Sequence, residues 1–119
     1  MTNPTRMIAV LPTNDIHASI KFYELLGFKP KGSDVYDGYQ VLIDGKGSEL
    51  HLTVAPEDWL IPGKSPCGVY WYADNVDELA VVASKYALHP PRKTSWGTYE
   101  FALSDPDENL IRVGRILVD

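Results

Sequence analysis

The residues that could do chemistry gather on two strand-like segments. Glu49, His51 and Thr53 alternate with apolar residues along 48–54, and Arg112 interrupts a second apolar segment near the end of the chain. Successive side chains of a strand point to opposite faces, so the first three residues share one face of a sheet. Glu49 and His51 have the types and spacing of a general acid–base pair, or of a hydrogen-bonded pair that lines a pocket.

Other nucleophile candidates have no neighbouring base. The three histidines, His17, His51 and His89, fall on an expected helix start, a strand and a loop, and no Ser or Cys motif adjoins them. Cys67 is the single cysteine, so it cannot form an intrachain disulfide, and no His or Cys lies at the spacing of a zinc site. The residues therefore predict neither a catalytic nucleophile nor a cofactor.

An internal repeat predicts the elements that position these strands. A shift of 60 residues aligns 13–30 with 73–90, and in both segments apolar residues recur every three or four positions. That period is typical of an amphipathic helix that covers a sheet. Strand-like segments flank the two helices in the same order. They span 7–12, 38–43 and 48–54 in the first half and 68–73, 98–103 and 109–114 in the second.

The repeat defines the expected fold class. Residues 55–68 are rich in Pro and Gly and are expected to link the two halves. The sequence thus predicts an α+β fold of two βαβββ modules, about 6–56 and 67–117, within a single domain that spans 1–119.

Cap residues support both helix assignments. Asp15 or Asn14 can cap the first helix, and Gly27 is suited to the left-handed conformation that ends it. Asn75 followed three residues later by Glu78 has the pattern of a capping box at the second helix.

Strand alternation also separates the expected core from the open face. The residues expected to pack under the helices are Leu50, Leu52, Val54, Trp71, Ile111 and Val113. The opposite face would present Tyr70 and Tyr72 together with the charged residues. Buried polar groups without partners are costly, so this mixed lining indicates a pocket with a polar occupant.

Composition excludes several classes of function. The net charge of -5 disfavours nucleic acid as a partner, because nucleic-acid binding needs clustered Lys and Arg. No apolar run approaches the roughly 20 residues of a membrane span, and the first ten residues lack a secretory signal. We therefore expect a cytoplasmic protein without a membrane partner.

Three segments resemble the glyoxalase/bleomycin-resistance group of the vicinal oxygen chelate superfamily. They are DIHASIKFYELLGF (15–28), SELHLTVAP (48–56) and WGTYEFALSDPDENLIRVG (96–114). The resemblance spans nearly the whole chain and implies curved mixed sheets with helices on their outer face. One departure is Glu108, where the family usually has glycine, so Asn109 is expected to adopt the positive φ of this turn.

Metal-using members of the superfamily hold the ion with ligands on inward strand positions. Carried over by position, these ligand sites fall on Ile8, Glu49, Gly68 and Arg112. A divalent ion needs three or four suitable donors, and of these side chains only Glu49 supplies one. The permanent charge of Arg112 would also repel a cation. No metal is therefore expected.

The same resemblance implies a pocket that binds without chemistry. Bleomycin-resistance proteins are dimers that sequester a bulky cationic antibiotic in two clefts at the subunit interface, with the N-terminal strand exchanged between subunits. We expect a metal-free homodimer of this type, with a small-molecule ligand of the bleomycin kind held by aromatic stacking and polar contacts. The expected ligand-binding residues are Tyr39, Glu49, His51, Thr53, Tyr70, Tyr72, Trp96 and Arg112.

Alternatives stay open at the sequence level. A divalent-metal-dependent glyoxalase-like lyase or extradiol-type dioxygenase is the second function, and an interaction module with a vestigial pocket is the third. Arg112 could instead end an edge strand and face solvent, Trp96 could pack a loop against the sheet, and Tyr39 could face solvent. A final hypothesis is that Glu49 and Arg112 from different subunits neutralise each other or share a ligand carboxylate. The roles of Trp59 and Cys67 stay undefined.

Overall fold

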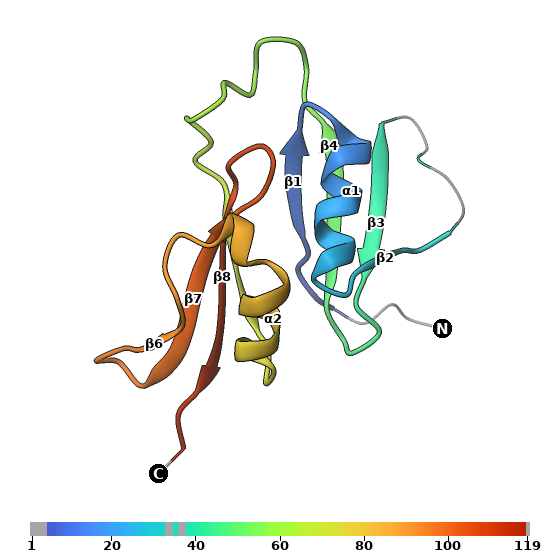
Figure 1. Ribbon diagram of the computed structural model, residues 1–119. Coiled ribbons are helices and arrows are strands. Elements are labelled where there is room, and N and C mark those ends of the chain that lie inside the picture. Colours follow the sequence, from blue (N-terminus) through green and yellow to red (C-terminus); the bar gives the residue numbers. More distant parts are fainter. Residues whose placement is uncertain (1–4, 33–34, 36–37, 119) are drawn as a thin grey trace.

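The chain folds as two similar modules, each a mixed sheet of four strands with one main helix (Figure 1). The computed structural model describes residues 5–32, 35 and 38–118. The first module contains β1 (Ala9–Thr13), α1 (Ile16–Leu25), β2 (Lys29–Pro30), β3 (Tyr39–Ile43) and β4 (Glu49–Val54). The second contains β5 (Gly68–Tyr72), α2 (Val76–Val82), a 3₁₀ helix (Ser84–Tyr86), β6 (Arg92–Lys93), β7 (Thr98–Ser104) and β8 (Leu110–Ile116). This arrangement confirms the predicted α+β fold class.

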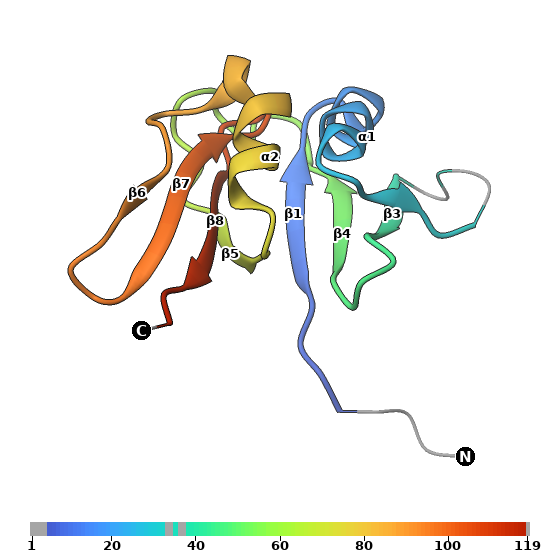
Figure 2. The same cartoon turned by 60° about the horizontal axis from the view of Figure 1, so that its bottom comes forward.

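The two sheets have the same topology. Their strand orders are β1-β4-β3-β2 and β5-β8-β7-β6. In each sheet the first and last strands of the module pair in parallel, and the remaining pairs are antiparallel. Strand β1 is an edge strand of its sheet, and it lies between β4 and the second module in both views (Figures 1 and 2).

Apolar residues from both modules form one core. The helix-facing residues Leu11, Leu52, Phe101 and Val113 are at most 2% exposed. Across the modules, the rings of Phe22 and Tyr86 pack edge to face with centroids 4.9 Å apart, and those of Phe28 and Trp71 lie 5.1 Å apart. Edge-to-face pairs and buried aromatic area stabilise such a junction. The covered faces of the two sheets therefore share a core.

The turn between β7 and β8 joins the modules through hydrogen bonds. Asp107 accepts from the backbone N–H of Asn14 at 2.8 Å and from the hydroxyl of Ser19 at 3.1 Å. Asp105 accepts from the hydroxyl of Tyr23 at 2.7 Å, and the Asn109 amide donates to the Pro12 carbonyl at 3.1 Å. Each acceptor meets a donor from the other module, so the buried turn is satisfied only when the modules pack together.

Most local predictions are confirmed. Asp15 caps α1 by accepting from the N–H of Ala18, and Gly27 follows α1 with φ of 96°. Leu50, Ile111 and Val113 are buried as expected, and Trp71 packs against the core. Among the described residues, no helix has the length and hydrophobicity that crossing a membrane requires.

Three local predictions are wrong. Asn75 makes no capping hydrogen bond with its side chain, although Asp77 and Glu78 lie in the first turn of α2. Glu108, not Asn109, takes the positive φ of 66°, because Asn109 donates to Asp105 from both its backbone and its side chain. Val54 is 43% exposed because it is the last residue of β4, beyond the cover of α1.

Candidate functional site

The open face of the first sheet holds a chain of hydrogen bonds from four side chains. Tyr39 Oη lies 2.6 Å from Nδ1 of His51, and Nε2 of His51 lies 2.6 Å from Glu49 Oε2. Arg6 Nη1 lies 3.0 Å from the other carboxylate oxygen, Oε1. A carboxylate only accepts, so Nε2 must hold a proton, and in the neutral imidazole Nδ1 accepts from Tyr39. The hydrogen bond from His51, assisted by Arg6, holds the pKa of Glu49 below its usual value.

The open face of the second sheet holds a separate network around a buried carboxylate. Glu100 is 4% exposed, and its Oε2 accepts from the Tyr70 hydroxyl and, at 2.9 Å, from the Thr98 hydroxyl. Arg112 Nη1 lies 3.6 Å from Oε1 of the same carboxylate. Burial by itself would raise the pKa of Glu100, but the hydrogen bonds and the charge of Arg112 outweigh it, so the pKa is lowered. Glu100 is thus a buried carboxylate with a lowered pKa, which accepts two hydrogen bonds at Oε2 and faces Arg112 with Oε1.

Gly114 makes room for this network. Tyr70 starts on the edge strand β5 and reaches across β8 to Glu100 on β7. A Cβ at Gly114 would lie 2.2 Å from Tyr70 Oη and 2.9 Å from the Cβ of Glu100. The phenol ring therefore lies over the bare backbone of β8. Burial and the hydrogen bond to Glu100 raise the pKa of Tyr70, which keeps its hydroxyl protonated as a donor.

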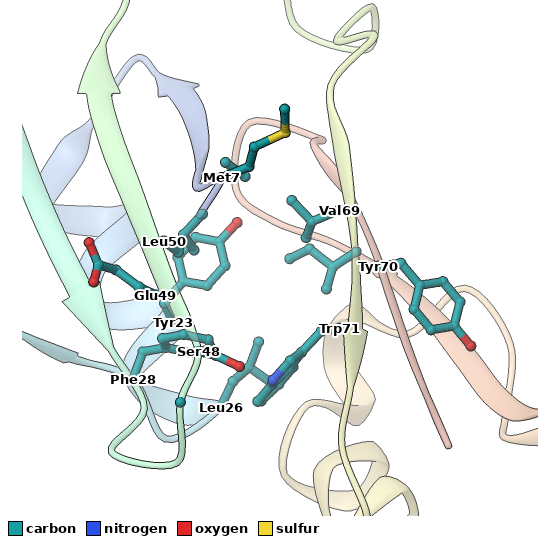
Figure 3. Close-up of a pocket in the computed structure, with 13 residues that line it drawn as sticks. Met7, Tyr23, Leu26, Phe28, Ser48, Glu49, Leu50, Val69, Tyr70 and Trp71 are labelled. Carbon is teal, nitrogen blue, oxygen red and sulfur yellow. The ribbon is translucent and has the colours of Figure 1, made fainter. Parts of the chain in front are cut away.

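The two networks lie on opposite sides of the chain. A crevice of about 430 Å³ lies between the modules, lined by apolar side chains such as Leu26, Phe28 and Trp71 (Figure 3). Glu49 and Tyr70 turn away from this crevice in opposite directions (Figure 3). Within one chain, the predicted lining is therefore divided into two half-sites. We call the Arg6, Tyr39, Glu49, His51 and Thr53 face the histidine half-site, and the Tyr70, Tyr72, Thr98, Glu100 and Arg112 face the arginine half-site.

The remaining predicted residues, Thr53, Tyr72 and Trp96, are more exposed or make fewer contacts. Thr53 is half-buried on β4 and directly opposite Tyr39 on β3. Tyr72 is 64% exposed, and its ring centroid lies 4.8 Å from that of Tyr70. Trp96 is 68% exposed in the turn before β7, so the alternative in which it packs a loop against the sheet is wrong.

Arg112 does not lie on an edge strand. Strand β8 lies between β5 and β7, so the alternative of an edge arginine facing only solvent is wrong. Its carboxylate partner within the chain is Glu100, whereas Glu49 already contacts Arg6 and His51. Arg112 thus has a carboxylate neighbour within its own chain, and its pairing with Glu49 of a second subunit stays a prediction.

Sequence reasoning missed four residues of these networks: Arg6, Thr98, Glu100 and Gly114. A signal for two of them was present, because alternation along 98–103 places Thr98 and Glu100 on one face and Phe101 on the other. The register of the hairpin, which pairs Glu100 with Gly114 and Ala102 with Arg112, would have placed Glu100 beside the arginine. The contact of Arg6 with Glu49 has no such signal, since it depends on the path of the segment before β1.

The family's metal-binding positions do not supply a metal-binding donor set. They fall on Ile8, Glu49, Gly68 and Arg112, and only the Glu49 carboxylate among these side chains can ligate a divalent ion. Within the described part of the chain, no group of three or more His, Cys, Asp or Glu side chains is placed to hold an ion. The residues at these positions therefore do not fit the metal that other members of the fold use.

The matching family model agrees with the fold. The model of the Glyoxalase/Bleomycin resistance protein/Dioxygenase superfamily matches residues 7–113. The chain belongs to this superfamily. A search of curated proteins gives no match.

Two of the similar solved structures are named for bleomycin binding or bleomycin resistance. A bleomycin-binding protein, solved in complex with bleomycin, is 26% identical with a TM-score of 0.77, over 94% of this chain and 98% of that one. A bleomycin resistance determinant encoded on the transposon Tn5 is also 26% identical, with a TM-score of 0.78 and coverage of 96% and 100%. A family enzyme from Burkholderia phytofirmans PsJN is 23% identical, with a TM-score of 0.73 and coverage of 92% and 97%, and supports the fold alone.

Proposed function

We propose that this protein is a metal-free, homodimeric small-molecule binder of the bleomycin-resistance type, which sequesters an aromatic, polar ligand in clefts between two subunits. Each cleft consists of the histidine half-site of one copy and the arginine half-site of the other. The function is binding, with no catalytic residue and no cofactor. The proposed ligand contacts are Tyr39, Glu49, His51, Thr53, Tyr70, Tyr72, Trp96 and Arg112.

The observation that supports this proposal most is that aromatic rings are exposed near carboxylates that already have hydrogen-bond or ion-pair partners. Tyr70, Tyr72 and Trp96 are 39%, 64% and 68% exposed, whereas the carboxylates of Glu49 and Glu100 already have partners. Exposed rings at fixed positions are suited to stacking on a planar ligand, each such contact contributing about 0.5 to 1.5 kcal/mol. A carboxylate held by several donors is suited to positioning its neighbours and has little capacity left for a metal.

A second observation supports the division of the cleft between subunits. Because Glu49 and Tyr70 point to opposite sides of one chain, a ligand that contacts both half-sites needs a second copy. Strand β1 pairs with β4 of its own chain here. Exchange of β1 between subunits stays a prediction.

The function is tested by titrating the protein calorimetrically with metal-free bleomycin and with 2-naphthoate, a small planar aromatic anion. Saturable binding of either compound at one site per chain is the expected result, and the Trp96→Phe variant should lose the part of the tryptophan fluorescence change that arises at the cleft. Elemental analysis of the purified protein is the companion measurement. A stoichiometric divalent ion, or no binding of either compound to folded protein at millimolar concentration, would overturn the proposal.

A further inference from the structure

The open face of the second sheet has a charge opposite to that of the whole chain. The chain has a net charge of -5. Strand register places Arg92 directly opposite Glu100, and Arg112 opposite Ala102, so all these residues share one face. Arg92 is exposed and the Arg112 side chain is 48% exposed, whereas Glu100 is buried. The charged residues that the described strands place on this face are thus two guanidinium groups and one carboxylate.

The single carboxylate is buried, with a side chain that is 5% exposed, so a ligand has little access to it. Its Oε2 atom accepts from both Tyr70 and Thr98, and its Oε1 atom faces Arg112. A cationic ligand group that approached Oε1 would be repelled by the neighbouring guanidinium of Arg112. The guanidinium of Arg112, in contrast, has five N–H donors and directs only Nη1 toward Glu100, at 3.6 Å. The face therefore offers exposed N–H donors, whereas its one carboxylate is buried beside a guanidinium.

A flat apolar surface lies beside these donors. The hydroxyl end of Tyr70 lies over the bare backbone at Gly114, the ring of Tyr72 packs beside it with centroids 4.8 Å apart, and Tyr70 stays 39% exposed. Tyr70 and Arg112 are directly paired residues on neighbouring strands. A planar group stacked on the exposed part of the Tyr70–Tyr72 pair would thus have its edge next to the Arg112 guanidinium, whose fork geometry matches a carboxylate.

From this placement we propose that the arginine half-site selects a planar aromatic compound that bears an oxyanion such as a carboxylate. Tyr70 stacks on the ring, Arg112 donates to the oxyanion, and Arg92 adds positive charge at the rim. This inference rests on the proposed binding function and narrows its ligand class from polar aromatic compounds to aromatic anions. It also predicts that this half-site disfavours a cationic aromatic group, although the whole protein is acidic, so the charge of a cationic ligand such as bleomycin would have to lie elsewhere in the cleft.

The test compares two probes of the same shape and opposite charge, 2-naphthoate and 2-naphthylmethylammonium, by calorimetry and by amide chemical shifts. With wild-type protein, 2-naphthoate should bind at least about tenfold more tightly, since a hydrogen bond to a charged group accounts for roughly that ratio. The shifts should centre on Tyr70, Arg112 and Gly114. Equal or tighter binding of the ammonium probe would overturn the inference and leave the binding function intact.

A matched pair of variants tests whether Arg112 causes the preference for the anionic probe. Arg112→Gln should weaken 2-naphthoate binding by about tenfold. Arg115→Gln, on the same strand but on the opposite face, where its guanidinium lies 5.0 Å from the Tyr99 ring centroid, should leave the affinity within about twofold. Equal losses in both variants would contradict a specific role for Arg112. If both probes and bleomycin fail to bind folded wild-type protein, the inference and the proposed function fail together.

Discussion

At the scale of single residues, Gly114 decides where the Tyr70 ring can lie. A methyl group there would lie 2.2 Å from the Tyr70 hydroxyl oxygen, a distance at which the ring must move. We expect Gly114→Ala to lower the free energy of unfolding by about 1 to 3 kcal/mol, because Tyr70 loses its hydrogen bond and Glu100 loses a donor. Urea unfolding measures the change.

A double-mutant cycle identifies the cause of that loss. In a Tyr70→Ala background, Gly114→Ala should cost about 1 kcal/mol less than in the wild type, because the hydroxyl that the methyl group meets is gone. Part of the cost should persist, since the Glu100 Cβ would still lie 2.9 Å away. A cost that is equal in both backgrounds would show that Gly114 does not act through Tyr70.

Glu100 gives the protein a pH dependence with a defined sign. Its pKa is lowered from the ordinary value of 4.5, so its contribution to stability is present above pH 4.5 and is lost as the pH falls through the folded-state value. The pKa of Asp105 is raised by burial, which has the opposite effect, but that term is common to wild type and variant. We expect the free energy of unfolding to fall more steeply between pH 6 and pH 3 in wild type than in Glu100→Gln. Parallel curves would contradict a lowered pKa at Glu100.

The sequence predicts which residues of the site share one face of a sheet. It does not predict which side chains contact each other across strands. Alternation alone placed Glu49, His51 and Thr53 together, because the period of two is a property of any strand. The partner of Arg112 depends on the register of the β7–β8 hairpin, and Arg6 depends on a segment outside any element. Neither can be obtained from local sequence pattern.

At the scale of elements, the turn between β7 and β8 has two features. Its side chains hydrogen-bond the two modules together, and one of its residues, Glu108, has a strained backbone conformation. Glu108 has φ of 66°, a region that costs an L-residue about 1 to 2 kcal/mol. Glycine there relieves the strain but adds freedom to the unfolded chain, about 0.4 to 1 kcal/mol. We expect Glu108→Gly to raise the free energy of unfolding by about 0.5 to 1 kcal/mol, which thermal and urea unfolding would both report.

The neighbouring aspartate serves as the control for this turn. Asp107→Gly should instead destabilise by about 1 to 3 kcal/mol, because the Asn14 N–H and the Ser19 hydroxyl lose their acceptor. Stabilisation by Asp107→Gly, or destabilisation by Glu108→Gly, would show that the backbone conformation and the docking bonds have been assigned to the wrong residues.

The elements themselves were largely predictable, and the failures have physical reasons. The repeat of 60 residues predicted the order of helices and strands, because the apolar face of each module's sheet must be covered by a helix. The short strands β2 and β6 were missed because two residues each are too few for a periodic pattern. Asn109 was expected at positive φ on propensity alone, but its side chain donates to Asp105 and Pro12, and that tertiary contact fixes its conformation.

At the scale of the whole molecule, the proposed cleft requires that the histidine half-site of one copy face the arginine half-site of another. Glu49 and Tyr70 point in opposite directions, so a short linker cannot join the two half-sites of one chain. In a Cys67→Ser background, we expect Thr53→Cys protein mixed with Tyr72→Cys protein to form a covalent dimer with a short bis-maleimide. The product should have twice the 13.3 kDa mass of the chain on a denaturing gel.

Each variant alone is the control for this cross-link. The proposed cleft brings the histidine half-site of one copy to the arginine half-site of another, so two copies of one variant do not place their cysteines together. Thr53→Cys alone and Tyr72→Cys alone should give much less dimer than the mixture, and dilution of the mixture below the dimer dissociation constant should abolish the product. A protein with both cysteines should cross-link between chains and not within one. A mixture that reacts no better than its separate components would refute a cleft built from two copies, and with it the proposed mode of sequestration.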